Sequence, residues 1–125
     1  MIRTNFSSGY PFEDAYGYAR AVRVGNQVFV SGTTARGQHL EGDAYTQMMA
    51  AIATVAAALG EAGAELRHVV RTVVYVLDMA DVHQIARAHE ETVGASRPAS
   101  TLVQVAALTP ASARAEIEVT AIIHD

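Results

Sequence analysis

The sequence contains no cysteine, no lysine and no tryptophan. Without cysteine, the chain cannot form a disulfide, bind zinc through thiolates or attack a substrate with a thiol. No apolar run reaches the ~18 residues that span a bilayer, so we expect no membrane contact. The opening residues, Met-Ile-Arg-Thr-Asn-Phe, lack the apolar stretch of a secretory signal. Together these absences favour a cytoplasmic protein.

Positive charge is also sparse. The nine basic residues are all arginines, spread from Arg3 to Arg114, and thirteen acidic residues give a net charge of −4 at pH 7. Because nonspecific binding to nucleic acid needs a clustered basic face, we expect no nucleic-acid partner. The histidines and acidic residues show no ligand spacing such as His-x-x-x-His, so we expect no metal site.

The composition, 50% hydrophobic and 18% charged, is typical of a globular chain. We expect one domain over residues 1–125, because no linker, repeat or low-complexity segment interrupts the chain. Residues 1–17 are rich in serine, glycine and aromatic residues and predict an irregular or edge segment. Two β-rich runs, 18–24 and 27–32, flank Gly25-Asn26 and predict a hairpin whose tight turn uses positive φ.

A first helix is predicted after a loop at residues 33–42. Asp43 can cap its N-terminus, because a short acidic side chain accepts hydrogen bonds from the unpaired amides of the first turn. Gly60 and Gly63 mark its end. Apolar side chains recur at helical spacing and form one stripe: Tyr45, Met48, Met49, Ile52, Val55, Ala56 and Leu59.

The second half of the chain predicts a strand, a helix and two further strands. The run at residues 69–77 is apolar on both faces from Val73 onward. Asp78 or Asp81 then caps a helix that Gly94 ends. The inner stripe of this helix is expected to hold Val82, Ile85, Ala86, His89 and Val93, with His89 as a hydrogen-bonded core or interface residue. Two strands are predicted at Thr101–Ala106 and Ala115–Ile123.

The element order β-β-α-β-α-β-β predicts an α+β fold in which one mixed β-sheet is packed by two α-helices. Helices on one face leave the other face of the 69–77 strand uncovered, although the side chains on that face are apolar. We therefore expect an oligomer that is built through the open face.

The last strand carries the first chemical signal. Glu116, Glu118 and Thr120 alternate with apolar residues, so their side chains share one face of the sheet. Two carboxylates at this spacing can form an acid–base pair when one is desolvated, because close carboxylates resist ionising together. Two alternatives stay open: a solvated sheet face, or interface salt bridges with Arg71 or Arg114.

Four segments, in collinear order over nearly the whole chain, resemble the RidA (reactive intermediate deaminase) or YjgF superfamily. They are Gly25-Asn26 with Val-Phe-Val-Ser-Gly at 28–32, the run at 69–79, the run at 97–108, and Glu-Ile-Glu-Val-Thr-Ala at 116–121. The resemblance implies a chorismate-mutase-like fold and a homotrimer with ligand clefts between subunits. It also implies hydrolysis of an enamine or imine, with release of ammonia and without a metal or organic cofactor.

The resemblance assigns roles to particular residues. Tyr18 matches the tyrosine of the cleft, Ser31 and Gly32 match a segment that lines it, and Glu116 matches the glutamate that positions or protonates the hydrolytic water. A carboxylate can orient water, a phenol can donate a hydrogen bond, and a backbone amide near Gly32 can stabilise negative charge. We therefore predict Glu116 and Tyr18 as catalytic residues, and Ser31 and Gly32 as substrate-binding residues.

One family feature is missing. Archetypal members bind the substrate carboxylate with an arginine two residues after a proline, and here Ser100 occupies that position after Pro98. Ser100 stays a substrate-binding candidate, but we expect a substrate other than the archetypal 2-imino acid. Arg97 is a candidate replacement, which the following proline should hold in an extended geometry. Alternatively, Arg97 ties its loop to Glu90 or Glu91.

These observations favour a small-molecule enzyme that deaminates or rearranges a reactive imine or enamine in an inter-subunit cleft. The alternative is a non-catalytic trimer that binds a ligand or regulates another process. A ribonuclease or translation-inhibitor role, which labels of some family members suggest, conflicts with the negative net charge.

Overall fold

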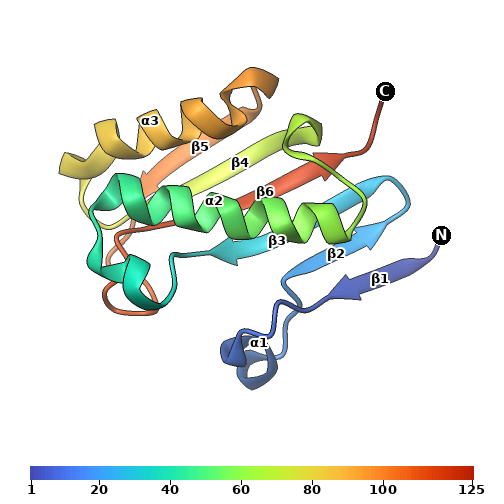
Figure 1. Ribbon diagram of the computed structural model, residues 1–125, viewed down its shortest axis with the longest axis horizontal. Coiled ribbons are helices and arrows are strands. Elements are labelled where there is room, and N and C mark those ends of the chain that lie inside the picture. Colours follow the sequence, from blue (N-terminus) through green and yellow to red (C-terminus); the bar gives the residue numbers. More distant parts are fainter.

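The computed structural model describes all residues, 1–125. Its strands are β1 (Arg3–Phe6), β2 (Ala21–Val24), β3 (Gln27–Thr33), β4 (Val69–Val76), β5 (Ala99–Gln104) and β6 (Ala115–Ile122). Its helices are α1 (Pro11–Tyr16), α2 (Ala44–Glu61) and α3 (Val82–Val93). One sheet holds all six strands, in the order β1-β2-β3-β6-β4-β5 (Figure 1). The predicted α+β class with one mixed sheet is confirmed.

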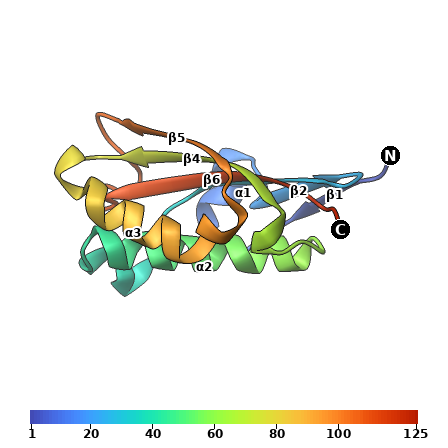
Figure 2. The ribbon, with the colours of Figure 1, turned by 90° about the horizontal axis from the view of Figure 1, so that it is seen from above.

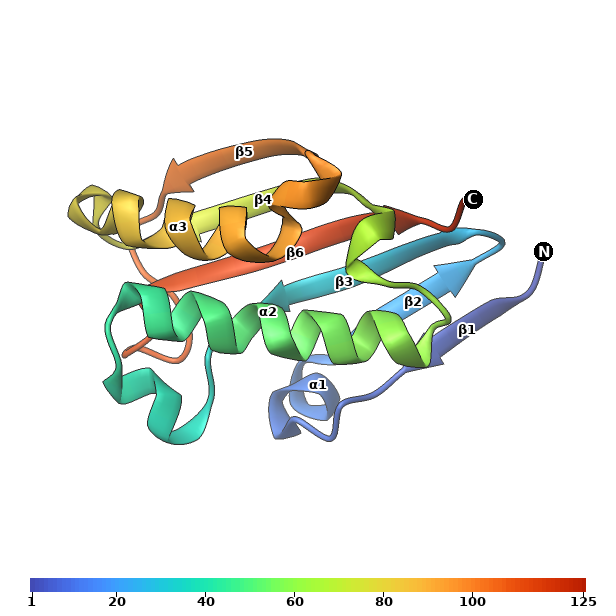
Figure 3. The same cartoon turned by 45° about the horizontal axis from the view of Figure 1, so that its top comes forward.

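The last strand of the chain lies inside the sheet, not at its edge. β6 pairs antiparallel with β3 on one side and with β4 on the other (Figure 3). The pair β4–β5 is parallel, and α3 supplies the crossover that a parallel connection needs. The inner position of β6 brings Glu116 and Glu118 beside residues of β3, which are more than eighty positions earlier in the sequence.

The hairpin predicted at Gly25-Asn26 is present. Val24 pairs with Gln27 across the turn, and Gly25 has a φ of 61°. The first strand is shorter than predicted: β2 begins at Ala21, although the backbone of Arg20 still bonds to Phe6 and Ser31. The N-terminal segment does form an edge strand, β1, but its second part is the short helix α1 and not irregular chain. Pro11 starts this helix, since its fixed φ suits the first helical position.

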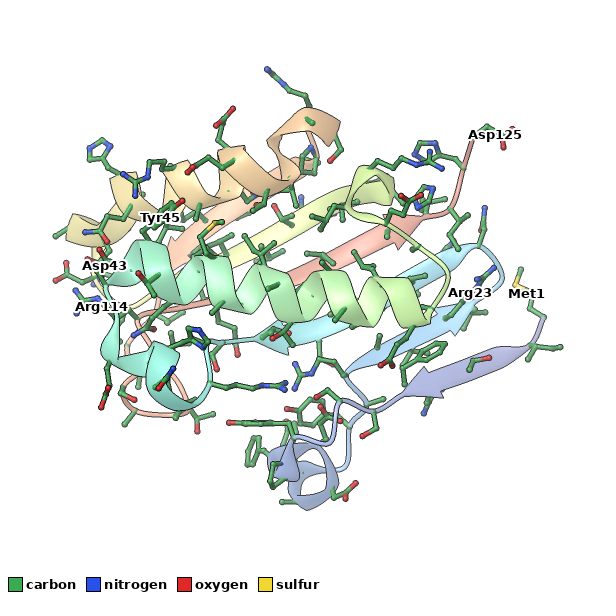
Figure 4. All side chains as sticks on the ribbon, viewed as in Figure 1. Met1, Arg23, Asp43, Tyr45, Arg114 and Asp125 are labelled. Atoms are coloured by element: carbon green, nitrogen blue, oxygen red, sulfur yellow. The ribbon has the colours of Figure 1, made fainter.

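The helix predicted after Asp43 is α2. The Asp43 side chain caps it by accepting a hydrogen bond of 2.8 Å from the backbone N–H of Thr46. The predicted stripe faces the sheet, and its fully buried members are Met48, Ile52, Val55 and Leu59. Tyr45 lies at the edge of the stripe and turns toward α3, where its hydroxyl donates to Glu91 at 2.8 Å (Figure 4).

The second predicted helix, α3, starts after Asp81 and ends at Gly94. Asp81 is the residue before the helix, while Asp78 caps the preceding 3-10 turn through its side chain. The prediction that Ala86 is buried is wrong: Ala86 is exposed and Ala88 is buried. Ala88 is three residues after Ile85, about one helical turn, so the two share a face of the helix. Ala86 follows Ile85 directly and points about 100° away from it.

Both final strands are present. β5 begins at Ala99 and ends at Gln104, two residues before the predicted bounds at each end, because its parallel ladder with β4 covers those residues. β6 ends one residue earlier than predicted, at Ile122.

The helices α2 and α3 cover the same face of the sheet (Figure 2). The core lies between them and the sheet, and includes Val74 and Ile117. On the opposite face, Val73 is half-buried, while Phe29 and Val103 are 44% and 41% exposed. No element of the chain packs over this open face as the helices do on the other, so its covering by a second subunit stays a prediction. No helix combines the length and apolar character needed to cross a membrane.

Candidate active site

A cleft of about 320 Å³ opens where β3 and β6 approach the α1 segment. Aromatic rings, arginines, glutamates and small polar residues line it: Tyr10, Phe12, Tyr16, Tyr18, Arg20, Ser31, Gly32, Thr34, Arg36, Thr109, Glu116 and Glu118. The cleft therefore brings together four of the six residues that the sequence predicted for the site. Those four are Tyr18, Ser31, Gly32 and Glu116, and the two outside it are Arg97 and Ser100.

The Glu116 carboxylate lies against Gly32. A Cβ atom on residue 32 would be 2.8 Å from Glu116 Cδ, so this carboxylate position requires glycine there. Glu116 is half-buried, and this burial raises the pKa of its carboxyl above the usual 4.5; the charge of Glu118 raises the pKa further, while Arg20 opposes the shift. The raised pKa makes the carboxyl a better proton donor and acceptor at higher pH than an ordinary glutamate would be.

Glu118, two residues along β6, is held by a different partner. The Tyr75 hydroxyl on β4 donates to Glu118 Oε1, and this bond, with burial, raises the pKa of Tyr75 above its usual value. Neither arginine considered as a salt-bridge partner reaches the two glutamates within the protomer. Arg71 donates to a threonine of β5, and Arg114 pairs with Asp81. Within the protomer, Glu116 therefore has no hydrogen-bond or ion-pair partner, whereas Glu118 accepts from Tyr75.

Arg20 is the buried cation at the base of the cleft. Its side chain and that of Glu13 on α1 are only 3% and 2% exposed, and Nε lies 3.2 Å from Glu13 Oε2. Nη1 donates to the Gly32 carbonyl at 2.8 Å and to Thr33 Oγ1 at 2.9 Å, and Nη2 donates to the Tyr18 hydroxyl at 2.8 Å. Arg20 thus joins α1, the first hairpin and the end of β3 in one network.

Glu13 remains ionised although it is buried. Burial alone would raise the pKa of Glu13, but hydrogen bonds from Ser8, Ser7 and Arg20 outweigh it and hold that pKa below the usual 4.5. Ser8 donates through both its backbone N–H and its hydroxyl. Glu13 and Arg20 therefore form a buried ion pair in which both side chains have further hydrogen-bond partners, and this network stabilises the wall of the cleft.

Tyr18 and Ser31 offer different groups to a ligand. The Tyr18 oxygen accepts from Arg20, which leaves the phenol proton free to be donated. The Ser31 hydroxyl donates to the Ala19 carbonyl at 2.7 Å, so toward the cleft it can only accept. No histidine or carboxylate bonds to Ser31 Oγ, and a nucleophilic serine would need such a base. This geometry gives no support to a nucleophilic Ser31, and its role in substrate binding stays a prediction.

Aromatic side chains from the α1 segment form one wall of the cleft. The Phe12 and Tyr16 rings stack with centroids 5.6 Å apart, and Tyr18 meets both edge-on. Phe12 and Tyr16 are 42% and 74% exposed. Exposed rings beside a concave site supply apolar contact surface for a ligand.

Ser100 lies on the edge strand β5, outside the cleft of its own protomer. Thr72 Oγ1 donates to Ser100 Oγ at 2.7 Å and lies 2.8 Å from His89 Nε2. Burial lowers the pKa of His89, which favours its neutral form. The prediction of His89 as a hydrogen-bonded residue at the inner side of α3 is confirmed.

Arg97 does not adopt the predicted extended geometry. Its φ and ψ are 48° and 57°, a left-handed conformation that ends the 3-10 turn before Pro98. Proline disfavours the right-handed helical region for the preceding residue, but proline is also common just after a left-handed helix cap, and this second tendency prevails at Arg97. The alternative ion pair is absent as well, because Glu91 pairs with Arg87 and Arg97 has no acidic partner.

Sequence reasoning missed the two arginines of the cleft. Arg20 had a signal, since it interrupts an otherwise apolar approach to β2 and a buried charge needs a partner. Arg36 lies in the loop after β3 and had no local signal, because only the fold brings it to Tyr10. Across residues 1–125, no group of three or more histidine and acidic side chains converges as a metal site.

Comparison with known proteins identifies the family to which the chain belongs. The family described as endoribonuclease L-PSP matches residues 11–123. An uncharacterised protein of Streptomyces coelicolor is 39% identical, over 91% of this chain and 87% of its own length. The 2-iminobutanoate/2-iminopropanoate deaminase of Mus musculus is 31% identical, over 84% of this chain and 80% of its own. A YjgF-family crystal structure from Mycobacterium tuberculosis has a TM-score of 0.91 at 41% identity, covering 98% of this chain and 100% of that one.

The chain belongs to the endoribonuclease L-PSP family, which is the YjgF/RidA family, and it has the fold of that family. The resemblance drawn from four sequence segments is confirmed. The relatives include proteins named as imine deaminases and others that are uncharacterised, so membership alone names no substrate.

Proposed function

We propose that this chain is a RidA-type enzyme that hydrolyses, and so deaminates, a reactive imine or enamine at Glu116. The observation that carries the proposal is the Glu116 carboxyl, which lies against Gly32 in the cleft and has a raised pKa. A general acid–base group needs both a position beside the substrate and a pKa near the working pH. Glu116 lines the cleft, and its pKa is shifted upward, in the direction that this role requires.

The reaction begins with the protonated imine. The Glu116 carboxylate takes a proton from water while the water oxygen bonds to the imine carbon, and the C=N electron pair moves to nitrogen. The product is a neutral carbinolamine. Glu116 returns its proton to the amino group, ammonia leaves, the C=O bond forms, and the hydroxyl proton passes to solvent. Tyr18 donates a hydrogen bond to the carbonyl oxygen of the product once its hydroxyl proton has left. An enamine enters after protonation at carbon.

The surroundings of Glu116 support a substrate with an apolar body. Phe12 and Tyr16 supply stacked, exposed rings at the cleft. Ser100 carries no charge, and losing a charge-assisted bidentate contact costs about tenfold to a few hundredfold in affinity. Without an arginine at position 100, and with little apolar surface to contact these rings, the small archetypal 2-imino acids should be poorer substrates than an imine with an aromatic body.

We also propose that the active form is a homotrimer. The support is the open sheet face, where Phe29 and Val103 are exposed and Val73 is only half-buried. In such an assembly the edge strand β5, with Ser100 and the nearby Arg97, would face the cleft of a neighbouring protomer.

The test measures ammonia released from imines that an oxidase generates in the same vessel. The panel contains 2-iminobutanoate, the imine of phenylalanine and the imine of benzylamine, each with spontaneous hydrolysis subtracted. The wild-type chain should accelerate at least one of them, and Glu116→Gln should lose most of that rate. Glu90→Gln, which removes an exposed carboxylate on α3, is the matched control and should retain the rate.

Two results would overturn the proposal. Ammonia release at the spontaneous rate for the whole panel would leave the binding trimer as the better interpretation. Full activity in Glu116→Gln would move the chemistry to another residue of the cleft.

A further inference from the structure

Most arginines of the chain have a protein acceptor for their guanidinium. Hydrogen bonds or ion pairs hold Arg3, Arg20, Arg23, Arg67, Arg71, Arg87 and Arg114. Arg36 and Arg97 have neither. Arg97 is exposed to solvent, whereas Arg36 is half-buried and lines the cleft that contains Glu116. Arg36 is therefore the cation of the cleft that the protein leaves without a partner.

The Arg36 guanidinium is held in a defined orientation, but it has no hydrogen-bond acceptor in the protein. Its Cζ atom lies 4.3 Å from the centroid of the Tyr10 ring, so the guanidinium is held over an aromatic face. A guanidinium has five N–H donors, and none of those of Arg36 bonds to the protein. Every fully buried side-chain nitrogen or oxygen in the chain has a hydrogen-bond partner. The unbonded donors of Arg36 are therefore not fully buried, and they are open to the two cavities that Arg36 lines.

Arg87 provides an internal comparison. Its Cζ atom lies 3.8 Å from the Tyr45 ring centroid, and Glu91 Oε1 lies 3.8 Å from its Nε atom. The same arginine-on-tyrosine arrangement thus has an acidic partner on the helix surface and none in the cleft. Arg20, the other arginine of the cleft, is not free to bind an anionic ligand, because its donors already serve four protein acceptors.

Burial makes the missing partner significant. Partial burial and the charge of Arg20 lower the pKa of Arg36, which means that its surroundings disfavour the charge. A carboxylate would relieve this cost through two parallel, charge-assisted hydrogen bonds. Glu116 and Glu118 line the same cleft, so a ligand that carries both an anion and a basic nitrogen meets a group of opposite charge for each.

We propose that Arg36, backed by Tyr10, binds the carboxylate of the cleft's ligand. The reacting C=N group of the same ligand faces Glu116. This second step rests on the proposed function and narrows the substrate to an anionic imine with an apolar body that contacts the aromatic wall. The anchoring charge comes from the loop after β3 of the same protomer that supplies Glu116.

The test uses benzoate as the probe, with benzamide as its uncharged counterpart, and follows binding by calorimetry and by backbone amide shifts. The wild-type chain should bind benzoate more tightly than benzamide and shift the amides of Gly32 and Thr34. Arg36→Met, which keeps an apolar contact with Tyr10, should weaken benzoate binding about tenfold to a hundredfold and leave benzamide unchanged. Arg36→Lys should lie between the two, and Arg87→Met, the matched control, should bind as the wild type does.

Three results would overturn the assignment. They are no benzoate binding at millimolar concentration, unchanged binding in Arg36→Met, or shifts confined to Ala53 and Ala57, which line the second cavity that Arg36 borders. The same experiments test the proposed function independently of the Arg36 assignment. In Glu116→Gln, ammonia release should disappear while Arg36-dependent benzoate binding persists. If no imine is hydrolysed but benzoate binding still depends on Arg36, the anion site stands and the deaminase proposal falls.

Discussion

Gly32 and Glu116 are in contact across the β3–β6 pair, and the carboxyl group occupies the space that a side chain on residue 32 would need. Gly32 has no positive φ, so this position requires glycine for space and not for backbone freedom. The register shift between Val30 and Thr33 places Gly32 at an irregular point of the ladder. The position of the Glu116 carboxyl thus depends on a residue that has no side chain.

We expect Gly32→Ala to impair function more than stability. The new Cβ would meet the end of the flexible Glu116 side chain, which can swing away, and alanine reduces the entropy of the unfolded chain. The free energy of unfolding should therefore change by less than about 1 kcal/mol. The displaced carboxyl should be better solvated, so its pKa should fall toward the usual value. Carbon-detected NMR titration of Glu116 measures this shift, and an unchanged pKa with full turnover would contradict the packing argument.

Glu116→Gln should stabilise the protein in a pH-dependent way. The pKa of Glu116 is raised in the folded state, so the folded protein binds this proton more tightly than the unfolded chain does. Its contribution to stability is complete below the usual 4.5 and is lost as the pH rises through the raised value. Denaturant unfolding at pH 4 and pH 8 should show an advantage for the variant that grows with pH. An advantage that is the same at both pH values would refute the linkage.

Arg20→Met should be strongly destabilising. It leaves Glu13 as a buried carboxylate without its cation, a change that typically costs about 3–5 kcal/mol. Arg20→Met with Glu13→Gln should recover part of that loss, because the uncompensated charge is gone. Denaturant unfolding of the two single variants and the double variant gives the coupling energy between the residues. Strictly additive losses would show that the ion pair itself contributes nothing.

The helices α2 and α3, the hairpin and the later strand runs were predictable because they depend on patterns within ten to twenty residues. Asp43 and the apolar stripe that follows define α2 locally, and Gly25-Asn26 defines the hairpin. β1 was harder to predict, because three of its four residues are exposed and it shows no apolar alternation. Ala86 shows the limit of the same reasoning: helical spacing selects a broad face, and packing selects which residues of that face are buried.

Some features of the candidate site were likewise predictable from local sequence patterns, and others were not. The shared face of Glu116 and Glu118 follows from the two-residue period of a strand, so the neighbouring charge that raises the pKa of Glu116 could be foreseen. The approach of Gly32 and the unpartnered state of Arg36 depend on which strands and loops become neighbours. The placement of β6 beside β3 decides the first, the packing of the loop after β3 against Tyr10 decides the second, and no local pattern encodes either.

The wild-type chain should be a trimer with a mass of about three times 13.3 kDa in light scattering at micromolar concentration. The open face presents Val103 at 41% exposure on the edge strand, and a charge there would have to be desolvated when a second subunit covers it. Val103→Glu should therefore shift the protein toward monomer while its far-ultraviolet circular dichroism stays native. Ala86→Glu places the same charge on an exposed position of α3, on the helix-covered side of the sheet, and should leave the trimer intact. If the wild type is a stable monomer, the trimer proposal is wrong, and Ser100 then has no cleft to enter, because its own protomer keeps it outside.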